Sequence, residues 1–215
     1  MSIENITLFS ELHAEPSWLQ DLRKKAFDKI DQLELPTIER VKFHRWNLGD
    51  GTITESEASA NIPDFTALDS NVKLVQFGTQ TVFEQIPQSL ADQGVLFTDF
   101  HSALEEIPQL VEDYFMSSVK YDDDKLAAYH TAYFNSGAVL YIPDNVEIEE
   151  AIEGIFYQDS DSDVPFNKHI LIIAGKNSKF SYLERLESKG NGSEKATANV
   201  TVEVIARSGA QVKFA

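Results

Sequence analysis

Three alternating carboxylates, Asp159, Asp161 and Asp163, have the spacing that opens a calcium-binding EF-hand loop. In such a loop, alternate side chains direct oxygen atoms at one cation. The rest of the loop does not fit, because its sixth position is Val164 instead of glycine and its twelfth is Ile170 instead of a bidentate glutamate. We therefore interpret these carboxylates as an acidic, solvated loop.

Two glycine-containing segments match phosphate-binding loops only in part. Gly175 and Lys176 resemble the end of a P-loop, but Ile170 stands where its first glycine is needed. Gly190 and Gly192 lack the third glycine and the helix of a dinucleotide site. We interpret the first segment as a turn between strands and the second as a flexible loop.

The histidines show no catalytic or metal-binding pattern. There is no HExxH pair, no GxSxG motif and no cysteine to complete a zinc site with the five histidines, His13, His44, His101, His130 and His169. His130 lies on the apolar face of an expected helix, which predicts a hydrogen-bonded core residue, and His169 is interpreted as a residue at a strand boundary. The sequence thus predicts no catalytic, cofactor-binding or metal-binding residue, and we expect a chain that is not an enzyme and has no cofactor.

Composition indicates a folded, acidic protein of one or two domains. Of 215 residues, 42% are hydrophobic and 11% aromatic, too many for a disordered acidic tail. Thirty-five acidic against 18 basic residues leave a formal charge of -17, which disfavours nucleic acid and anionic membranes as partners. The apolar run 170–174 is far shorter than a membrane span of about 20 residues, and the start has no basic region, so the cytoplasm is the expected compartment.

The first part of the chain has mainly helical patterns. Residues 17–34 combine a capping box at Ser17 and Gln20 with apolar residues at helical spacing, and Pro36 ends the pattern. Proline starts and apolar periodicity predict further helices over 88–93 and 109–119, and Asp122 to Asp124 precede another over 126–134. Residues 49–61 are expected to form a loop and 72–77 a short strand. We predict a mainly helical N-terminal domain over residues 1–136.

The second part contains an internal repeat of strand pairs. Ile173 and Ile205 are 32 residues apart, Phe180 and Val212 repeat this interval, and Ile142 precedes Ile173 by 31. Short strands broken by a polar turn bury their faces by stacking, which predicts the start of a β-solenoid over residues 137–215 with Ile142, Ile173 and Ile205 facing one core. An antiparallel sandwich with similar turns is the alternative. Because the chain stops inside the third copy, we expect it to be a fragment of a longer protein.

Several segments of the chain together carry a resemblance to a known family. Two of them are the stretch from Glu15 through Trp18 to Leu35 and Pro36, and Gly94 to Phe97 with Pro108 to Val111. The most specific segment runs from Asp123 to Pro143, where an aromatic, an aliphatic residue and a proline end the first strand. These segments resemble the opening helix, the stretch before the core and the start of the core in the SufB/SufD family of iron-sulfur cluster assembly scaffold proteins. Residues 43–48 match only loosely.

The resemblance implies an α+β chain that corresponds to the family's N-terminal half. It implies a mainly helical domain followed by the first turns of a right-handed parallel β-helix. It also implies a non-catalytic scaffold that works with SufB and the ATPase SufC. The region that docks SufC and the residues that build the cluster would lie beyond this half. The sequence leaves open whether the chain forms a homodimer.

A β-solenoid carbohydrate-active enzyme is the second functional hypothesis. Such an enzyme would carry an export signal and a groove lined by acidic and basic residues. The strands of this chain contain few basic residues, which disfavours that hypothesis.

Overall fold

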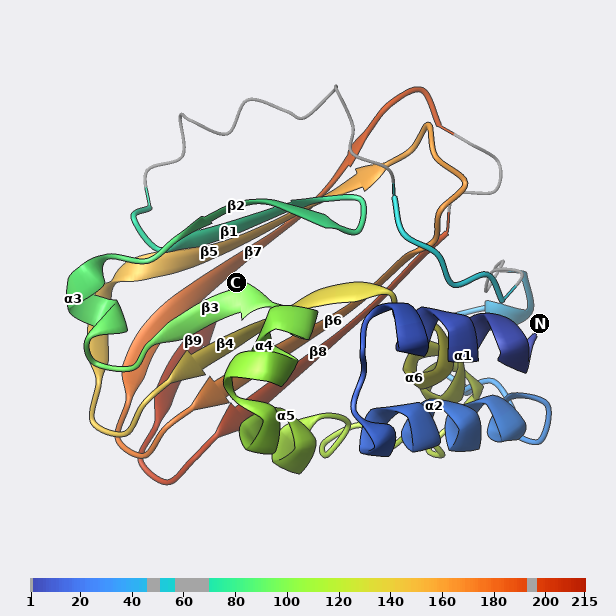
Figure 1. The fold of residues 1–215 in the computed structure, drawn as a ribbon, viewed down its shortest axis with the longest axis horizontal. Coiled ribbons are helices and arrows are strands. Elements are labelled where there is room, and N and C mark those ends of the chain that lie inside the picture. The colour runs from blue at the N-terminus through green and yellow to red at the C-terminus, as the bar shows by residue number, and fades with distance from the viewer. Residues whose placement is uncertain (1, 46–50, 57–69, 193–196) are drawn as a thin grey trace.

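Two β-sheets and a set of helices build the protein (Figure 1). The structure is a computed structural model that describes residues 2–45, 51–56, 70–192 and 197–215. The first sheet has the order β2-β1-β5-β7-β9, formed by Gln80–Gln85, Lys73–Phe77, Glu147–Asp159, Lys179–Lys189 and Gln211–Phe214. The second sheet has the order β3-β4-β6-β8, formed by Leu96–Asp99, Ser136–Ile142, Phe166–Ala174 and Ala198–Ala206.

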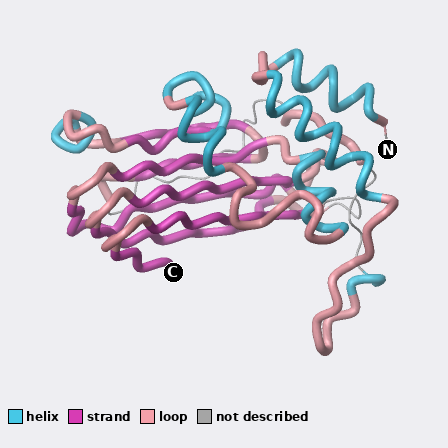
Figure 2. Tube along the Cα trace, turned by 90° about the horizontal axis from the view of Figure 1, so that it is seen from below, coloured by secondary structure: helices cyan, strands magenta, loops and turns pink. Residues whose placement is uncertain are grey.

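The helices lie beside both ends and along one side of the strands (Figure 1). Figure 1 shows α1, α2 and α6 gathered near the N-terminus, and α4 and α5 in front of the second sheet. In Figure 2 the strands run side by side, with the N-terminus among the helices. The helices are α1 (Ile3–Leu12), α2 (Ser17–Ile30), α3 (Gln88–Ala91), α4 (Phe100–Glu106), α5 (Pro108–Tyr114) and α6 (Lys125–Tyr133), with a 3-10 turn at Phe43–Arg45.

The expected fold class, a mainly helical N-terminal domain followed by a right-handed parallel β-helix, is wrong. The structure has two mixed sheets, and the N-terminal part supplies β1, β2 and β3 to them. β2 pairs antiparallel with β1, and β3 pairs antiparallel with β4, while the other pairs are parallel. The helical periodicity of single segments could not show these pairings, because pairing joins residues far apart in the chain. The domain boundary between residues 136 and 137 stays a prediction.

The 32-residue interval is confirmed as the register of the parallel strands. Ile173 pairs with Ile205, and Phe180 pairs with Val212. The expected place of Ile142 is wrong by one residue, because Ile142 pairs with Ala174. A shift of one residue turns a strand side chain to the other face. Ile142 therefore packs in the cluster shared by both sheets, whereas Ile173 and Ile205 pack against the helices.

Strand β6 is buried on both faces, which explains its continuous apolar run. Ile170 and Ile172 belong to the cluster shared by the two sheets, while Leu171 and Ile173 pack with Phe100 of α4 and neighbouring residues. A strand covered on both sides needs no polar alternation.

Turns at matching positions support the repeat. Asn145, Asn177 and Gly209 have φ values of 64°, 56° and 76°, and lie 32 residues apart. The side-chain amide of Asn177 donates to Oδ1 of Asn145 at 3.2 Å. Asparagine and glycine are the residues that adopt this left-handed conformation most readily. The turns are thus built alike in successive copies.

The helix predictions are correct in place but differ in detail. α2 ends at Ile30, not at residue 34, and its cap residue is Pro16. The expected capping box at Ser17 does not form; instead the Gln20 amide donates to the Glu15 carbonyl at 2.7 Å. Asp124 caps α6 by accepting from the backbone of Ala127 at 2.9 Å. Within the described residues, no helix is long and apolar enough to cross a membrane.

Candidate functional site

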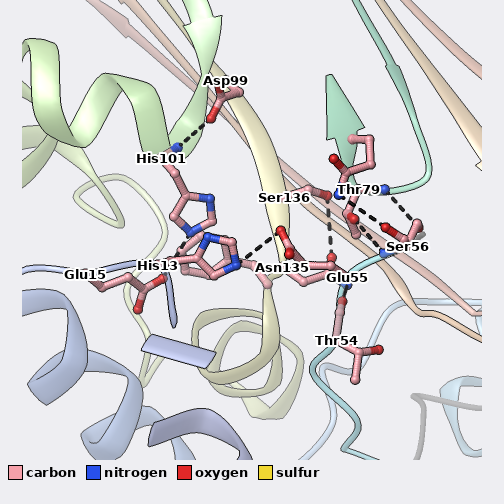
Figure 3. A network of polar contacts seen from close by, with 12 residues as sticks. His13, Glu15, Thr54, Glu55, Ser56, Thr79, Asp99, His101, Asn135 and Ser136 are labelled. Atoms are coloured by element: carbon pink, nitrogen blue, oxygen red, sulfur yellow. Dashed lines mark hydrogen bonds and ion pairs between the residues drawn. The ribbon is translucent and has the colours of Figure 1, made fainter. Parts of the chain in front are cut away.

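A polar cavity of about 240 Å³ lies where segment 51–56 meets α4, the β1–β2 hairpin and the start of β4. Figure 3 shows the polar contacts around it. Ser56 and Thr79 exchange hydrogen bonds of 2.8 and 3.1 Å, and Asn135 donates to the Thr54 carbonyl at 2.9 Å. These contacts hold segment 51–56 to the sheets. The lining consists of His13, Glu55, Gln76, Thr79, Gln80, Thr81, Asp99, Phe100, His101, Asn135, Ser136 and Gly137.

Two stacked imidazoles form one wall of this cavity. The rings of His13 and His101 lie 4.1 Å apart with an interplanar angle of 20°. Each faces a different carboxylate: Nε2 of His13 lies 3.2 Å from Glu55, and Nε2 of His101 lies 3.3 Å from Glu15 (Figure 3). Burial and the neighbouring His101 lower the pKa of His13, and Glu55 acts in the opposite direction. The ring nitrogens thus point to separate partners and not to one shared position.

Behind this wall, Glu15 and Arg23 form a buried ion pair. Both side chains are fully buried, and the guanidinium donates to the carboxylate at 2.6 and 2.8 Å. Burial alone would raise the pKa of Glu15, but Arg23 and hydrogen bonds from His101 and Ser10 hold it well below its usual range. The same guanidinium donates to the carbonyl groups of Ala132 and Phe134, so it joins α2 to the end of α6.

Lys168 of β6 is a second buried cation close to the cavity. Its Nζ donates at 2.8 Å to three acceptors: Oε1 of Gln76, the carbonyl of Gly78 and Oγ of Ser136. Three acceptors match the three N–H bonds of an ammonium group. Burial lowers the pKa of Lys168 well below its usual value. Since β6 and β4 belong to one sheet and β1 to the other, this side chain links the two sheets.

A chain of polar side chains, His130, His169 and Glu203, crosses the packed face of the second sheet. Nε2 of His130 lies 3.0 Å from Nδ1 of His169, and Nε2 of His169 lies 3.2 Å from Glu203. Glu203 also accepts from the backbone N–H groups of Met116 and Ser118 at 2.6 and 2.7 Å. Burial opposes ionisation of Glu203, but His169 and nearby backbone N–H groups lower its pKa. Burial lowers the pKa of both histidines.

These groups are arranged to pair with one another. Among the described residues, no set of three His, Asp or Glu side chains could hold a metal ion. The contacts join α1, α2, α4 and α6 to one another, and His130 joins α6 to β6, which is what a rigid structural unit requires. That the chain carries no catalytic, cofactor-binding or metal-binding residue stays a prediction.

Four of the histidines singled out from the sequence, His13, His101, His130 and His169, belong to this network, whereas the loop motifs lie apart from it. Asp161 accepts from the backbone of Asn191 at 2.7 Å within a turn beside β5, and Lys176 lies in a turn after β6. His130 is a buried, hydrogen-bonded core residue, as predicted. The interpretation of His169 as a boundary residue is wrong, because it lies inside β6 and is fully buried. Three predictions lie partly outside the described residues: the loose family match over 43–48, the loop over 49–61 and the flexible loop over 190–195. The side chain of His44 also lies outside them.

The sequence did not predict the structural roles of four buried charged side chains, Glu15, Arg23, Lys168 and Glu203. One signal for Arg23 was present, because it lies on the helix stripe of Leu19, Ala26 and Ile30, all of them buried. An arginine on a buried stripe needs a carboxylate or carbonyl partner. No comparable local signal marks Lys168 or Glu203, since their partners lie far away in the sequence.

Comparison with known proteins finds similarity to one family. The family described as SufBD protein N-terminal region matches residues 64–153. The iron-sulfur cluster assembly protein SufD of Bacillus subtilis is 33% identical over 223 residues, which cover 98% of this chain and 51% of that protein. The predicted resemblance to the SufBD family, which rested on the segments from Glu15 to Pro143, is confirmed by these matches.

Other SufBD family proteins are similar over the same extent. An iron-sulfur cluster assembly SufBD family protein of Staphylococcus epidermidis is 25% identical over 230 residues, covering 98% of this chain and 49% of that protein. A SufBD family protein of Trieres chinensis is 27% identical over 231 residues, covering 97% and 47%. The chain thus spans about half the length of the curated SufBD relatives that it matches.

Proposed function

We propose that this chain acts as a non-catalytic scaffold in iron-sulfur cluster assembly, together with homologues of SufB and of the ATPase SufC. The observation that carries the proposal is the similarity to SufD over 98% of the chain. The described geometry agrees with a scaffold, because its buried polar groups connect helices to sheets. The cytoplasm is the compartment in which we expect it to act.

A scaffold of this kind need not hold the cluster itself. The chain contains no cysteine, and protein-bound iron-sulfur clusters depend mainly on cysteine thiolates. We therefore place the cluster, which is the product of assembly, on a partner or at an interface with one. We expect the purified chain to retain no stoichiometric cluster after anaerobic incubation with iron and sulfide; a stable chromophore on the chain alone would contradict this part of the proposal.

The partner proposal is tested by affinity purification of the chromosomally tagged gene product. We expect homologues of SufB and SufC in stoichiometric amounts, identified by mass spectrometry. A tagged protein of similar size and similar negative charge serves as the control, because a chain with a formal charge of -17 attracts basic proteins without specificity. Recovery of neither homologue above that control would contradict the proposal.

A further inference from the structure

Helix α1 carries apolar side chains on two of its sides. Ile6 and Phe9 are buried against α2 and α6 in the helical cluster. Leu8 and Leu12, one turn apart on another side, are 64% and 73% exposed. A surface helix of a globular protein usually has one apolar stripe and polar residues elsewhere. The second stripe is therefore not explained by the packing of the described residues.

The exposed leucines border a groove. It has a volume of about 360 Å³ and lies between α1 and segment 51–56. Phe9 and Ile53 belong to the buried cluster beneath and contribute to its lining, so the groove lies on a packed part of the protein. Grooves of this kind between a helix and a neighbouring segment bind amphipathic helices through apolar side chains one turn apart. The complete lining is Asn5, Leu8, Phe9, Leu12, Ile53, Thr54 and Glu55.

The charged residues of α1 have a single sign. Glu4 and Glu11 are exposed, and the helix contains no lysine or arginine. Glu55 belongs to the groove itself and keeps 35% of its side chain exposed. Complementary charge at an interface speeds association and disfavours partners of the same sign. Acidic side chains on α1 and in the groove lining thus favour an apolar segment flanked by lysine or arginine.

We propose that α1 and segment 51–56 form a docking groove for a basic amphipathic helix of a protein partner, with Leu8 and Leu12 as its main apolar contacts. The proposal goes beyond the scaffold function and does not depend on it. The groove adjoins the polar cavity, because Glu55 lines both, but the two share no other lining residue. Few interface residues usually carry most of the binding energy, so two leucines can dominate binding.

The test uses a fluorescent 14-residue probe peptide of leucine and lysine with leucines at helical spacing, and a matching peptide of leucine and glutamate. Fluorescence anisotropy with the whole chain should show saturable binding of the lysine peptide only. Leu8→Ser with Leu12→Ser should weaken this binding by about tenfold or more. Glu4→Gln with Glu11→Gln should weaken it less and reduce its dependence on salt, because screening acts on exposed charges.

Matched controls separate the groove from general attraction to an acidic protein. Ile38→Ser removes an apolar side chain that is 53% exposed and lies outside the groove, and should leave the affinity unchanged. Far-ultraviolet circular dichroism should show that all variants keep their fold. Equal affinity of the wild type and the leucine double variant would overturn the proposal, as would equal binding of the glutamate peptide. Self-association that the leucine variant abolishes would overturn it too, because a second copy would then occupy the groove.

Discussion

Nε2 of His130 lies 3.0 Å from Nδ1 of His169, and both imidazoles are buried between α6 and the second sheet. One of these two ring nitrogens must donate and the other accept, because two N–H groups or two lone pairs facing each other would repel. The carboxylate of Glu203 lies at 3.2 Å from Nε2 of His169, so we assign the His169 proton to Nε2 and the shared proton to His130. The pair is thus neutral in the folded protein.

This pair predicts a loss of stability in mild acid. Burial lowers the folded pKa of His130 and His169, so the unfolded chain takes up protons below about pH 6.5 while the folded chain does not. The free energy of unfolding should therefore fall as pH drops from 7 to 5.5, by up to about 1.4 kcal/mol per pH unit for each histidine. Urea unfolding at several pH values measures it. His169→Gln should flatten this slope, and a stability that stays constant in that window would contradict the assignment.

The raised pKa of Glu184 predicts the opposite dependence of stability on pH. Burial raises its pKa to about 7, so the folded state keeps a proton that the unfolded state releases near pH 4.5. Its contribution to stability is present at low pH and is lost as pH rises through about 7. Glu184→Gln should thus raise the free energy of unfolding at pH 8 by about 1 kcal/mol, after allowance for its partial exposure, and change it little at pH 5. The exposed Glu39→Gln is the control, and an equal gain at both pH values would refute the explanation.

The buried pair of Glu15 and Arg23 predicts strong coupling. Arg23→Met leaves a buried carboxylate without its cation and should reduce the free energy of unfolding by about 3 to 5 kcal/mol. Glu15→Gln should reduce the free energy of unfolding by a similar amount. The double variant should lose much less stability than the sum of the two single losses. Lys25→Met, on the exposed side of α2, should change stability by less than about 0.5 kcal/mol. Additive losses of the two single variants in chemical unfolding would show that the pair is not coupled.

Substitution of Asn177 tests whether the left-handed backbone conformation determines which residues the turns accept. Its φ of 56° favours asparagine or glycine, and its amide contacts Asn145. Asn177→Ala should cost about 1 to 2 kcal/mol, because alanine is strained in this conformation, whereas Asn177→Gly should cost clearly less. Thermal unfolding followed by circular dichroism compares the two variants. Equal losses would mean that the lost side-chain hydrogen bond, and not the backbone conformation, stabilises the turn.

Local patterns in the sequence predicted α2, α3, α5, α6 and the spacing of the parallel strands, but not α1 or α4. Periodicity predicted α2 and α6, because a helix depends on residues close together in the chain. The interval between Ile173 and Ile205 predicted the 32-residue register, because repeated units pair at equivalent positions. The segments from Glu15 to Pro143, with the most specific one between Asp123 and Pro143, predicted the resemblance to the SufBD family, which comparison confirms.

The tertiary structure alone decided how the strands pair and which polar groups meet. β1 lies beside β5 although more than 60 residues separate them, and β3 joins β4, so the N-terminal part belongs to both sheets and not to a helical domain of its own. The partners of Lys168 in β1 and its turn come from about 90 residues earlier in the chain. Such contacts depend on the packing of the whole chain, and no local spacing encodes them, which is why the buried polar network could be found only in three dimensions.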